Sequence, residues 1–97
     1  MMYITVDGML SGTGLRDSKN GGYIDPDELG ISDFLKSKLS AWLGQYANCH
    51  YMQYKDESQI ELLDKEGMEI CKMLKQEMPN LEIDYYSNAK LKRLPIN

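Results

Sequence analysis

Hydrophobic residues recur at steps of three and four between residues 31 and 46, the spacing that places side chains on one face of an α-helix. The pattern predicts a helix that Ser32 can cap and that runs to about residue 47. The face to be buried consists of Ile31, Phe34, Leu35, Leu39, Trp42, Leu43 and Tyr46. Since it holds the single tryptophan and the single phenylalanine, we expect Trp42 and Phe34 to point inward and the rest of the chain to pack on this helix.

Four other stretches carry weaker strand patterns. Residues 2–7 and 81–86 alternate apolar and polar side chains, which is typical of strands with one buried face. Residues 48–55 (NCHYMQYK) are rich in tyrosine and predict a further strand. The tail 87–97 leaves two alternatives open, an edge strand or a loose end.

A second helix is predicted from about Asp56 to Met78, where Pro79 ends it. The alternative is a helix that begins at Asp64, with residues 57–63 as a separate turn. Asp56 and Gln59 resemble a capping box at its start. Its buried stripe would consist of Ile60, Leu63, Gly67, Ile70, Cys71, Leu74 and Met78.

Residues 8–22 contain five glycines, which disfavour a helix because each interior glycine costs about 1 kcal/mol relative to alanine. A connection this long without secondary structure is unusual in a small domain and often functional. A short hairpin inside it is the alternative. Beyond it, Asp25 can cap a short helix that Pro26 begins and Gly30 ends.

The predicted order is therefore β, long loop, α, β, α, β. Strands that alternate with helices indicate the α/β class, with the helices packed on a small sheet. The length of 97 residues fits one domain covering residues 1–97.

Charge is unevenly distributed around the net value of −4. Residues 1–84 hold all fifteen acidic residues, whereas the tail from Tyr85 holds three basic residues and no acidic one. An acidic body disfavours a nucleic-acid partner, because phosphates need cations. It favours a basic protein partner, or serves only to keep the chain dissolved.

The cysteines and the hydropathy pattern bear on the compartment. Cys49 and Cys71 lie far apart in apolar or helical contexts, which favours small buried side chains over a disulfide. No N-terminal apolar region resembles a secretory leader, and no apolar run approaches membrane-spanning length. We therefore expect a protein of the reducing cytoplasm without a membrane partner.

The segment DSKNGGYIDPDEL, beginning at Asp17, resembles the calcium loop of EF-hand proteins. In residues 17–28 the resemblance would make ligands of the Asp17, Asp25 and Glu28 side chains and of the Tyr23 carbonyl. Lys19 and Gly21 stand where short oxygen side chains are needed. A calcium-binding module is therefore the alternative reading, and a turn followed by a capped helix explains the same residues without a metal or any cofactor.

Neither of the two remaining chemical motifs is complete. Gly12-Thr13-Gly14 lacks the further glycine or lysine of a nucleotide loop. Cys49 and His50 would point to opposite faces of the predicted strand, which prevents a thiolate–imidazole pair. No spacing of carboxylates selects an acid–base couple, so we expect no enzyme.

Two acidic groups adjoin tyrosine, a composition common in protein–protein contacts because tyrosine buries area and still hydrogen-bonds. The first places Asp25, Asp27, Glu28 and Asp33 beside Tyr23. The second consists of Asp56, Glu57, Glu61, Asp64 and Glu66, with only Lys65 among them. Facing lysines and arginines of a partner, such carboxylates would speed association.

The segments GLRDSKNGGYIDPDELGIS and LLDKEGMEICKMLKQEMPNLEIDYYS resemble small bacterial immunity proteins of contact-dependent growth inhibition and related polymorphic toxin systems. The resemblance implies a cytoplasmic protein that binds a cognate toxin domain, commonly a basic ribonuclease, and blocks its active site. From charge and expected exposure, we predict that the contact residues are Arg16, Asp17, Tyr23, Asp25, Asp27, Glu28 and Asp33.

Overall fold

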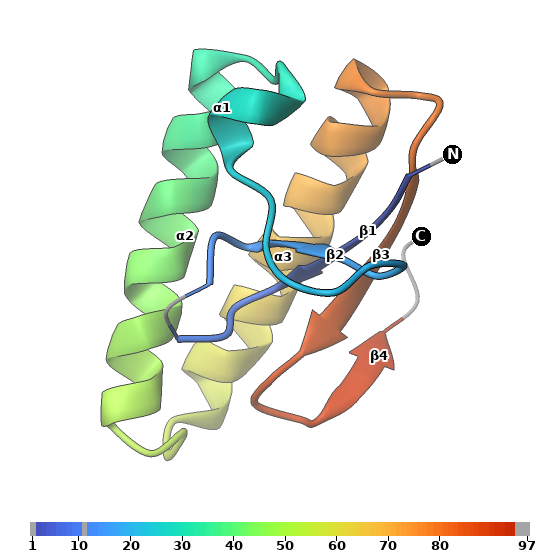
Figure 1. The fold of residues 1–97 in the computed structure, drawn as a ribbon. Helices are drawn as coiled ribbons and strands as arrows, with labels where there is room; N and C mark the ends of the chain where they lie inside the picture. Colours follow the sequence, from blue (N-terminus) through green and yellow to red (C-terminus); the bar gives the residue numbers. More distant parts are fainter. Residues whose placement is uncertain (1, 11, 95–97) are drawn as a thin grey trace.

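The computed structural model describes residues 2–10 and 12–94, in which two long helices lie on one face of a four-stranded sheet (Figure 1). Its elements are β1 (Tyr3–Asp7), β2 (Leu15–Asp17), α1 (Pro26–Leu29), α2 (Asp33–Tyr51), α3 (Glu57–Glu77), β3 (Glu82–Ser87) and β4 (Lys92–Leu94). The predicted α/β class is confirmed. The predicted order is wrong in one place, because no strand separates α2 from α3.

The sheet has the order β2-β1-β3-β4, with β1 and β3 parallel in the centre and an antiparallel strand at each edge. Ile4 and Val6 of β1 are buried in the core, as the alternation of residues 2–7 predicted. The prediction for residues 81–86 is confirmed by β3, which pairs Val6 with Tyr85. The tail supplies the edge strand β4, one of the two alternatives left open.

The predicted strand at residues 48–55 is wrong, because α2 continues to Tyr51. Cys49 is buried in helical step with Trp42 and Tyr46, so burial at a spacing of three to four residues overrides the β-propensity of the tyrosines. The Met52 amide still donates to the Asn48 carbonyl at 3.1 Å and closes the helix. The chain then turns directly into α3.

The inward orientation predicted for Phe34 is also wrong, since 64% of this residue is exposed. The buried face of α2 is centred on Leu35, Leu39, Trp42 and Tyr46. Phe34 precedes Leu35 by one residue, which rotates its side chain about 100° away from that face in a helix of 3.6 residues per turn. Trp42 is buried as predicted.

The glycine-rich segment holds the strand β2, which pairs with β1 and places Leu15 opposite Val6. The hairpin is therefore formed by β1 and β2, rather than lying inside residues 8–22 as the alternative had it. The Thr13 hydroxyl donates to the Ile24 carbonyl at 2.6 Å and fastens the hairpin to the segment before α1. Gly14 adopts φ +89°, a left-handed conformation that favours glycine.

The core between the helices and the sheet is closed by a few specific contacts. The Trp42 indole N–H donates to the Leu63 carbonyl at 2.8 Å and joins α2 to α3. Gly67 allows the Tyr85 ring to lie directly against α3, where a Cβ would overlap that ring. Cys49 and Cys71 are both buried free thiols, as expected of small apolar side chains. Among the described residues, no helix is both long and apolar enough to span a bilayer.

Candidate partner-binding surface

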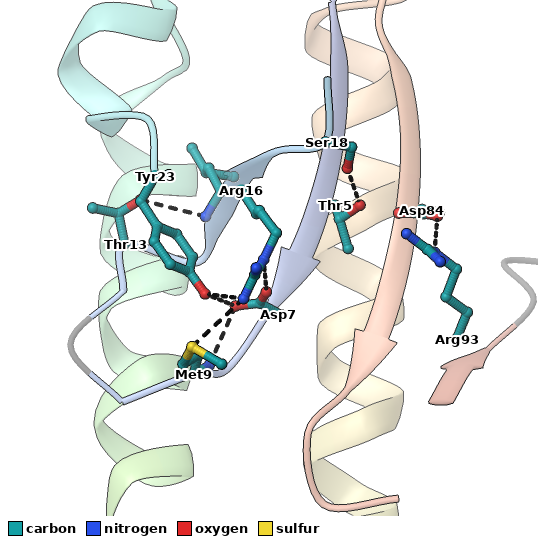
Figure 2. Close-up of polar contacts among 10 residues, drawn as sticks. Thr5, Asp7, Met9, Thr13, Arg16, Ser18, Tyr23, Asp84 and Arg93 are labelled. Atoms are coloured by element: carbon teal, nitrogen blue, oxygen red, sulfur yellow. Dashed lines mark hydrogen bonds and ion pairs between the residues drawn. The ribbon is translucent and has the colours of Figure 1, made fainter. Parts of the chain in front are cut away.

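Asp7, Arg16 and Tyr23 form a hydrogen-bonded group on the sheet face opposite α2 and α3 (Figure 2). Arg16 and Tyr23 were predicted to contact a partner, whereas Asp7 was not. The Arg16 Nε donates to the buried Asp7 carboxylate at 2.8 Å. The Tyr23 hydroxyl donates to the other oxygen of Asp7 at 2.8 Å and accepts from Arg16 Nη2 at 2.8 Å. The guanidinium also lies 5.0 Å from the centroid of the Tyr23 ring.

The hydrogen bonds of this group stabilise the hairpin within the chain. Burial, followed by the hydrogen bond to Asp7, raises the pKa of Tyr23 to about 12, so its hydroxyl stays protonated and donates. The hydrogen bond to Asp7 raises the pKa of Arg16. Arg16 and Tyr23, both predicted to contact a partner, are thus held to Asp7 and have less freedom to reach another molecule.

Asp84, Arg93 and Tyr3 form a second polar group on the same face. Arg93 Nε and the Tyr3 hydroxyl donate to the same Asp84 oxygen, at 2.8 and 2.7 Å. Between the two groups lies a hollow of about 300 Å³, lined by Thr5, Asp7, Met9, Arg16, Tyr86 and Arg93. Each arginine of the lining is paired with a carboxylate, Arg16 with Asp7 and Arg93 with Asp84.

Asp17, also predicted to contact a partner, is the last residue of β2 and precedes a turn. Its carboxylate accepts from the backbone amides of Lys19 and Asn20, each at 3.0 Å. These hydrogen bonds, that of the Asn20 amide foremost, lower the pKa of Asp17. The carboxylate therefore stabilises its own turn.

The geometry gives the EF-hand resemblance no support. Asp17 ends a strand where the calcium unit needs an incoming helix, and Glu28 lies in a helix of only four residues. In residues 2–10 and 12–94, no three His, Cys, Asp or Glu side chains group closely enough to hold a metal ion. Cys49 and His50, adjacent in α2, add no catalytic pair, because Cys49 is buried while His50 is exposed.

The remaining predicted carboxylates gather at the end of the molecule where α1 leads into α2 (Figure 1). Asp25 caps α1 by accepting from the Asp27 amide at 2.9 Å, as predicted. Lys36 reaches back to Asp27 at 3.0 Å and to Asp33 at 3.6 Å. Asp27 foremost raises the pKa of Lys36. Glu28 is exposed in α1.

The structure adds Glu77, the last residue of α3, to this group. Its carboxylate accepts from the amide and the hydroxyl of Ser32, both at 2.7 Å. Helices α2 and α3 run in opposite directions, which brings the end of α3 beside the start of α2 (Figure 1). We call Asp25, Asp27, Glu28, Asp33 and Glu77 the acidic end.

The second acidic group predicted from the sequence is largely dispersed, which corrects that expectation. Asp64 is buried and accepts from the Tyr85 hydroxyl at 2.7 Å and the Ser87 hydroxyl at 3.1 Å. Glu61 and Asp64 both contact Lys90, at 2.7 and 3.4 Å. Asp64 faces the core because it lies in helical step with the buried Gly67 and Cys71 of α3.

Of the seven residues predicted to contact a partner, Asp25, Asp27, Glu28 and Asp33 lie together at the acidic end, whereas Arg16, Asp17 and Tyr23 make hydrogen bonds within the chain. Their contact with a partner stays a prediction. The sequence missed Glu77, because nothing in it signals which helix ends meet. Asp7 and Asp84 were also missed, although the alternation along residues 2–7 and 81–86 places both on the face opposite the core.

A model of the family described as Serratia CdiI immunity protein-like matches residues 7–88, which is most of the chain and includes the helices α1, α2 and α3 and the strands β2 and β3. A search of curated proteins finds no match.

Proposed function

Because the chain belongs to the Serratia CdiI immunity protein-like family, we propose that it binds a cognate toxin domain through its acidic end and blocks the toxin by occlusion. In this proposal the chain performs no chemistry of its own. It acts in the cytoplasm as a stoichiometric inhibitor of a basic nuclease, most simply a ribonuclease.

The observation that carries the proposal is the imbalance of charge at the acidic end. Five carboxylates gather there, and Lys36 pairs with two of them, Asp27 and Asp33. Lys36 lies between Asp27 and Asp33 and neutralises them only in part. Clustered carboxylates create a negative potential that attracts cations over distances up to the Debye length, about 8 Å at physiological salt.

A nuclease fits this surface because its substrate is a polyanion. Enzymes that bind phosphates present lysine and arginine at the catalytic site. An acidic inhibitor can occupy that site in place of the nucleic acid, and opposite charges also accelerate the encounter. The acidic end therefore supports a partner with a cationic active site more strongly than a neutral one.

The test begins with the toxin domain encoded next to this chain. We expect isothermal titration calorimetry to give one-to-one binding with a Kd in the nanomolar range, weakening as salt rises. Added in equal amount, the chain should abolish cleavage of an RNA substrate. Absence of binding, or binding that leaves cleavage intact, would contradict the proposal.

Matched variants then locate the contact. Asp27→Asn with Glu28→Gln removes two charges from the acidic end, and both positions are exposed. Glu69→Gln with Glu82→Gln removes two charges from exposed positions on α3 and β3. We expect the first pair to raise Kd at least tenfold and the second to change it less than threefold, because only nearby charges escape screening. Equal effects would remove the acidic end from the interface.

A further inference from the structure

The outward face of α2 carries little charge, in contrast to that of its neighbour α3. Between residues 34 and 51 the exposed residues are Phe34, Ser37, Ser40, Ala41, Gly44, Gln45, Asn48, His50 and Tyr51, with no Asp, Glu, Lys or Arg among them. The two lysines of this stretch, Lys36 and Lys38, are half-buried. Most exposed residues of α3 are charged, including Glu57, Glu61, Lys65, Glu69 and Lys72. Solubility alone would favour charge on both helices, and loss of charge is the compositional mark of an interface centre.

Large apolar side chains stand at both ends of this face. Phe34 is 64% exposed at one end, and Tyr51 and Met52 are 73% and 66% exposed at the other. At 1.5 Å per residue, Phe34 and Tyr51 lie about 25 Å apart along the helix. Aromatic and methionine side chains are enriched at protein interfaces, where tyrosine in particular supplies binding energy.

Gly44 lies midway between these side chains, and no packing contact with the described residues requires a glycine there. A Cβ at Gly44 would meet no atom within 4 Å, whereas a Cβ at Gly67 would overlap the Tyr85 ring. An interior glycine weakens a helix relative to alanine. A partner that approaches the α2 backbone closely would account for a glycine at this position.

The end that carries Tyr51 and Met52 is held in place by its neighbours. The His50 ring packs edge-on against Tyr51 and Tyr54, with centroids 6.0 and 5.6 Å apart. His50 Nδ1 and the Tyr54 hydroxyl lie 3.0 Å apart, within hydrogen-bonding distance. Tyr54 in turn packs on the buried Tyr46. A surface ordered before binding loses less entropy when a partner docks.

We propose that this face of α2, from Phe34 to Met52, forms the apolar centre of the toxin interface, which rests on the proposed function above. Charged residues with an excess of carboxylates border it at both ends: Asp27, Asp33 and Lys36 beside Phe34, and Lys55, Asp56 and Glu57 beyond Met52. The toxin surface that complements it is an apolar groove bordered by lysine and arginine. A contact about 25 Å long matches an interface of standard size, about 800 Å² on each partner.

A bulky substitution at Gly44 tests the proposal without disturbing the fold. Gly44→Gln adds a long uncharged side chain in open space and replaces a poor helix former with a good one. We expect the melting temperature to stay or rise while the Kd for the toxin domain rises at least tenfold. The matched control Glu69→Gln places the same side chain on α3 and should change Kd less than threefold.

Truncation of the exposed apolar residues gives the second readout. Phe34→Ala with Tyr51→Ala should raise Kd at least tenfold, whereas Leu62→Ala, at a residue 48% exposed on α3, should leave it unchanged. Normal affinity of Gly44→Gln and of the double variant would overturn this inference. If the Asp27→Asn, Glu28→Gln pair still weakened binding, the proposed function would stand without it. The inference would also be overturned if the wild-type chain proved to be a dimer and Gly44→Gln dissociated that dimer without weakening toxin binding.

Discussion

At the scale of single residues, two buried carboxylates form hydrogen bonds that hold neighbouring side chains to the sheet. Asp7 binds Arg16 and Tyr23 on one face of the sheet. Asp64 binds Tyr85 and Ser87 on the other. Each lies 1% exposed, and a buried charge that loses a partner costs far more than an exposed one. These two aspartates therefore belong to stability rather than to partner binding.

Replacing Tyr23 by phenylalanine removes the hydroxyl that donates to Asp7 and accepts from Arg16. We expect a loss of about 1–2 kcal/mol in the free energy of unfolding, measured by urea denaturation. The control Tyr51→Phe alters a hydroxyl of a residue 73% exposed and should stay within about 0.5 kcal/mol. Equal effects of the two substitutions would show that the Asp7 group is not stabilising.

The pH dependence of Tyr23 has a definite sign. Its pKa is raised to about 12 from the usual 10.0, so between these values the folded protein holds a proton that the unfolded chain has lost. Stability from this hydroxyl is complete below pH 10 and is lost as pH rises towards 12. Tyr23→Phe should therefore lose less stability than wild type between pH 10 and 12, and parallel pH curves would contradict this.

Asp64 and Glu61 offer a matched pair, because both contact Lys90 while only Asp64 is buried. Asp64→Ala leaves the Tyr85 and Ser87 hydroxyls without their acceptor and should cost about 2–4 kcal/mol in thermal or urea unfolding. Glu61→Ala removes an exposed ion pair and should cost less than about 1 kcal/mol. Similar losses from both would mean that Asp64 contributes only through Lys90.

At the scale of elements, the sequence predicted the helices better than their ends and orientations. The apolar spacing located α2 and α3 and their capping residues Ser32 and Asp56. It failed at residues 48–55, where tyrosines suggested a strand although Cys49 continued the buried face of α2. Phe34 was predicted to point inward because apolar residues tend to be buried. The spacing of apolar residues along the chain does not show whether a side chain is covered by its own core or by a partner.

The two helical glycines should respond oppositely to alanine. Gly44→Ala should raise the free energy of unfolding by up to about 1 kcal/mol, because its methyl group meets no atom and favours the helix. Gly67→Ala should lower it by about 1–3 kcal/mol, since the methyl group overlaps the Tyr85 ring. Urea unfolding of both variants checks this, and stabilisation by Gly67→Ala would contradict the packing of α3 on β3.

At the scale of the whole molecule, the structure separates charge used for folding from charge that remains at the surface. Of the contact residues predicted from the sequence, Asp25, Asp27, Glu28 and Asp33 meet at the acidic end, where Glu77 joins them. The sequence could indicate this group because its first four members are close along the chain. It could not show that Arg16 and Tyr23 are held by Asp7, since that depends on the pairing of β1 with β2.

Lys36 gives a prediction opposite to the loss of carboxylates. Lys36→Gln removes the cation between Asp27 and Asp33 and makes the acidic end more negative. We expect a faster association rate with the toxin domain at low salt, by about two- to fivefold, with the gain disappearing at high salt. Stopped-flow mixing measures the rate, and Lys72→Gln on the exposed face of α3 is the control. A slower rate for Lys36→Gln would mean that Lys36 itself contacts the toxin.

The most direct test of the account is amide hydrogen exchange of the chain with and without its toxin domain. The account predicts that toxin slows exchange across residues 25–36, which hold α1 and the start of α2, and leaves the exposed middle of α3 unchanged. Protection confined to β4 and the outer part of β3, with residues 25–36 exchanging as in the free chain, would contradict it.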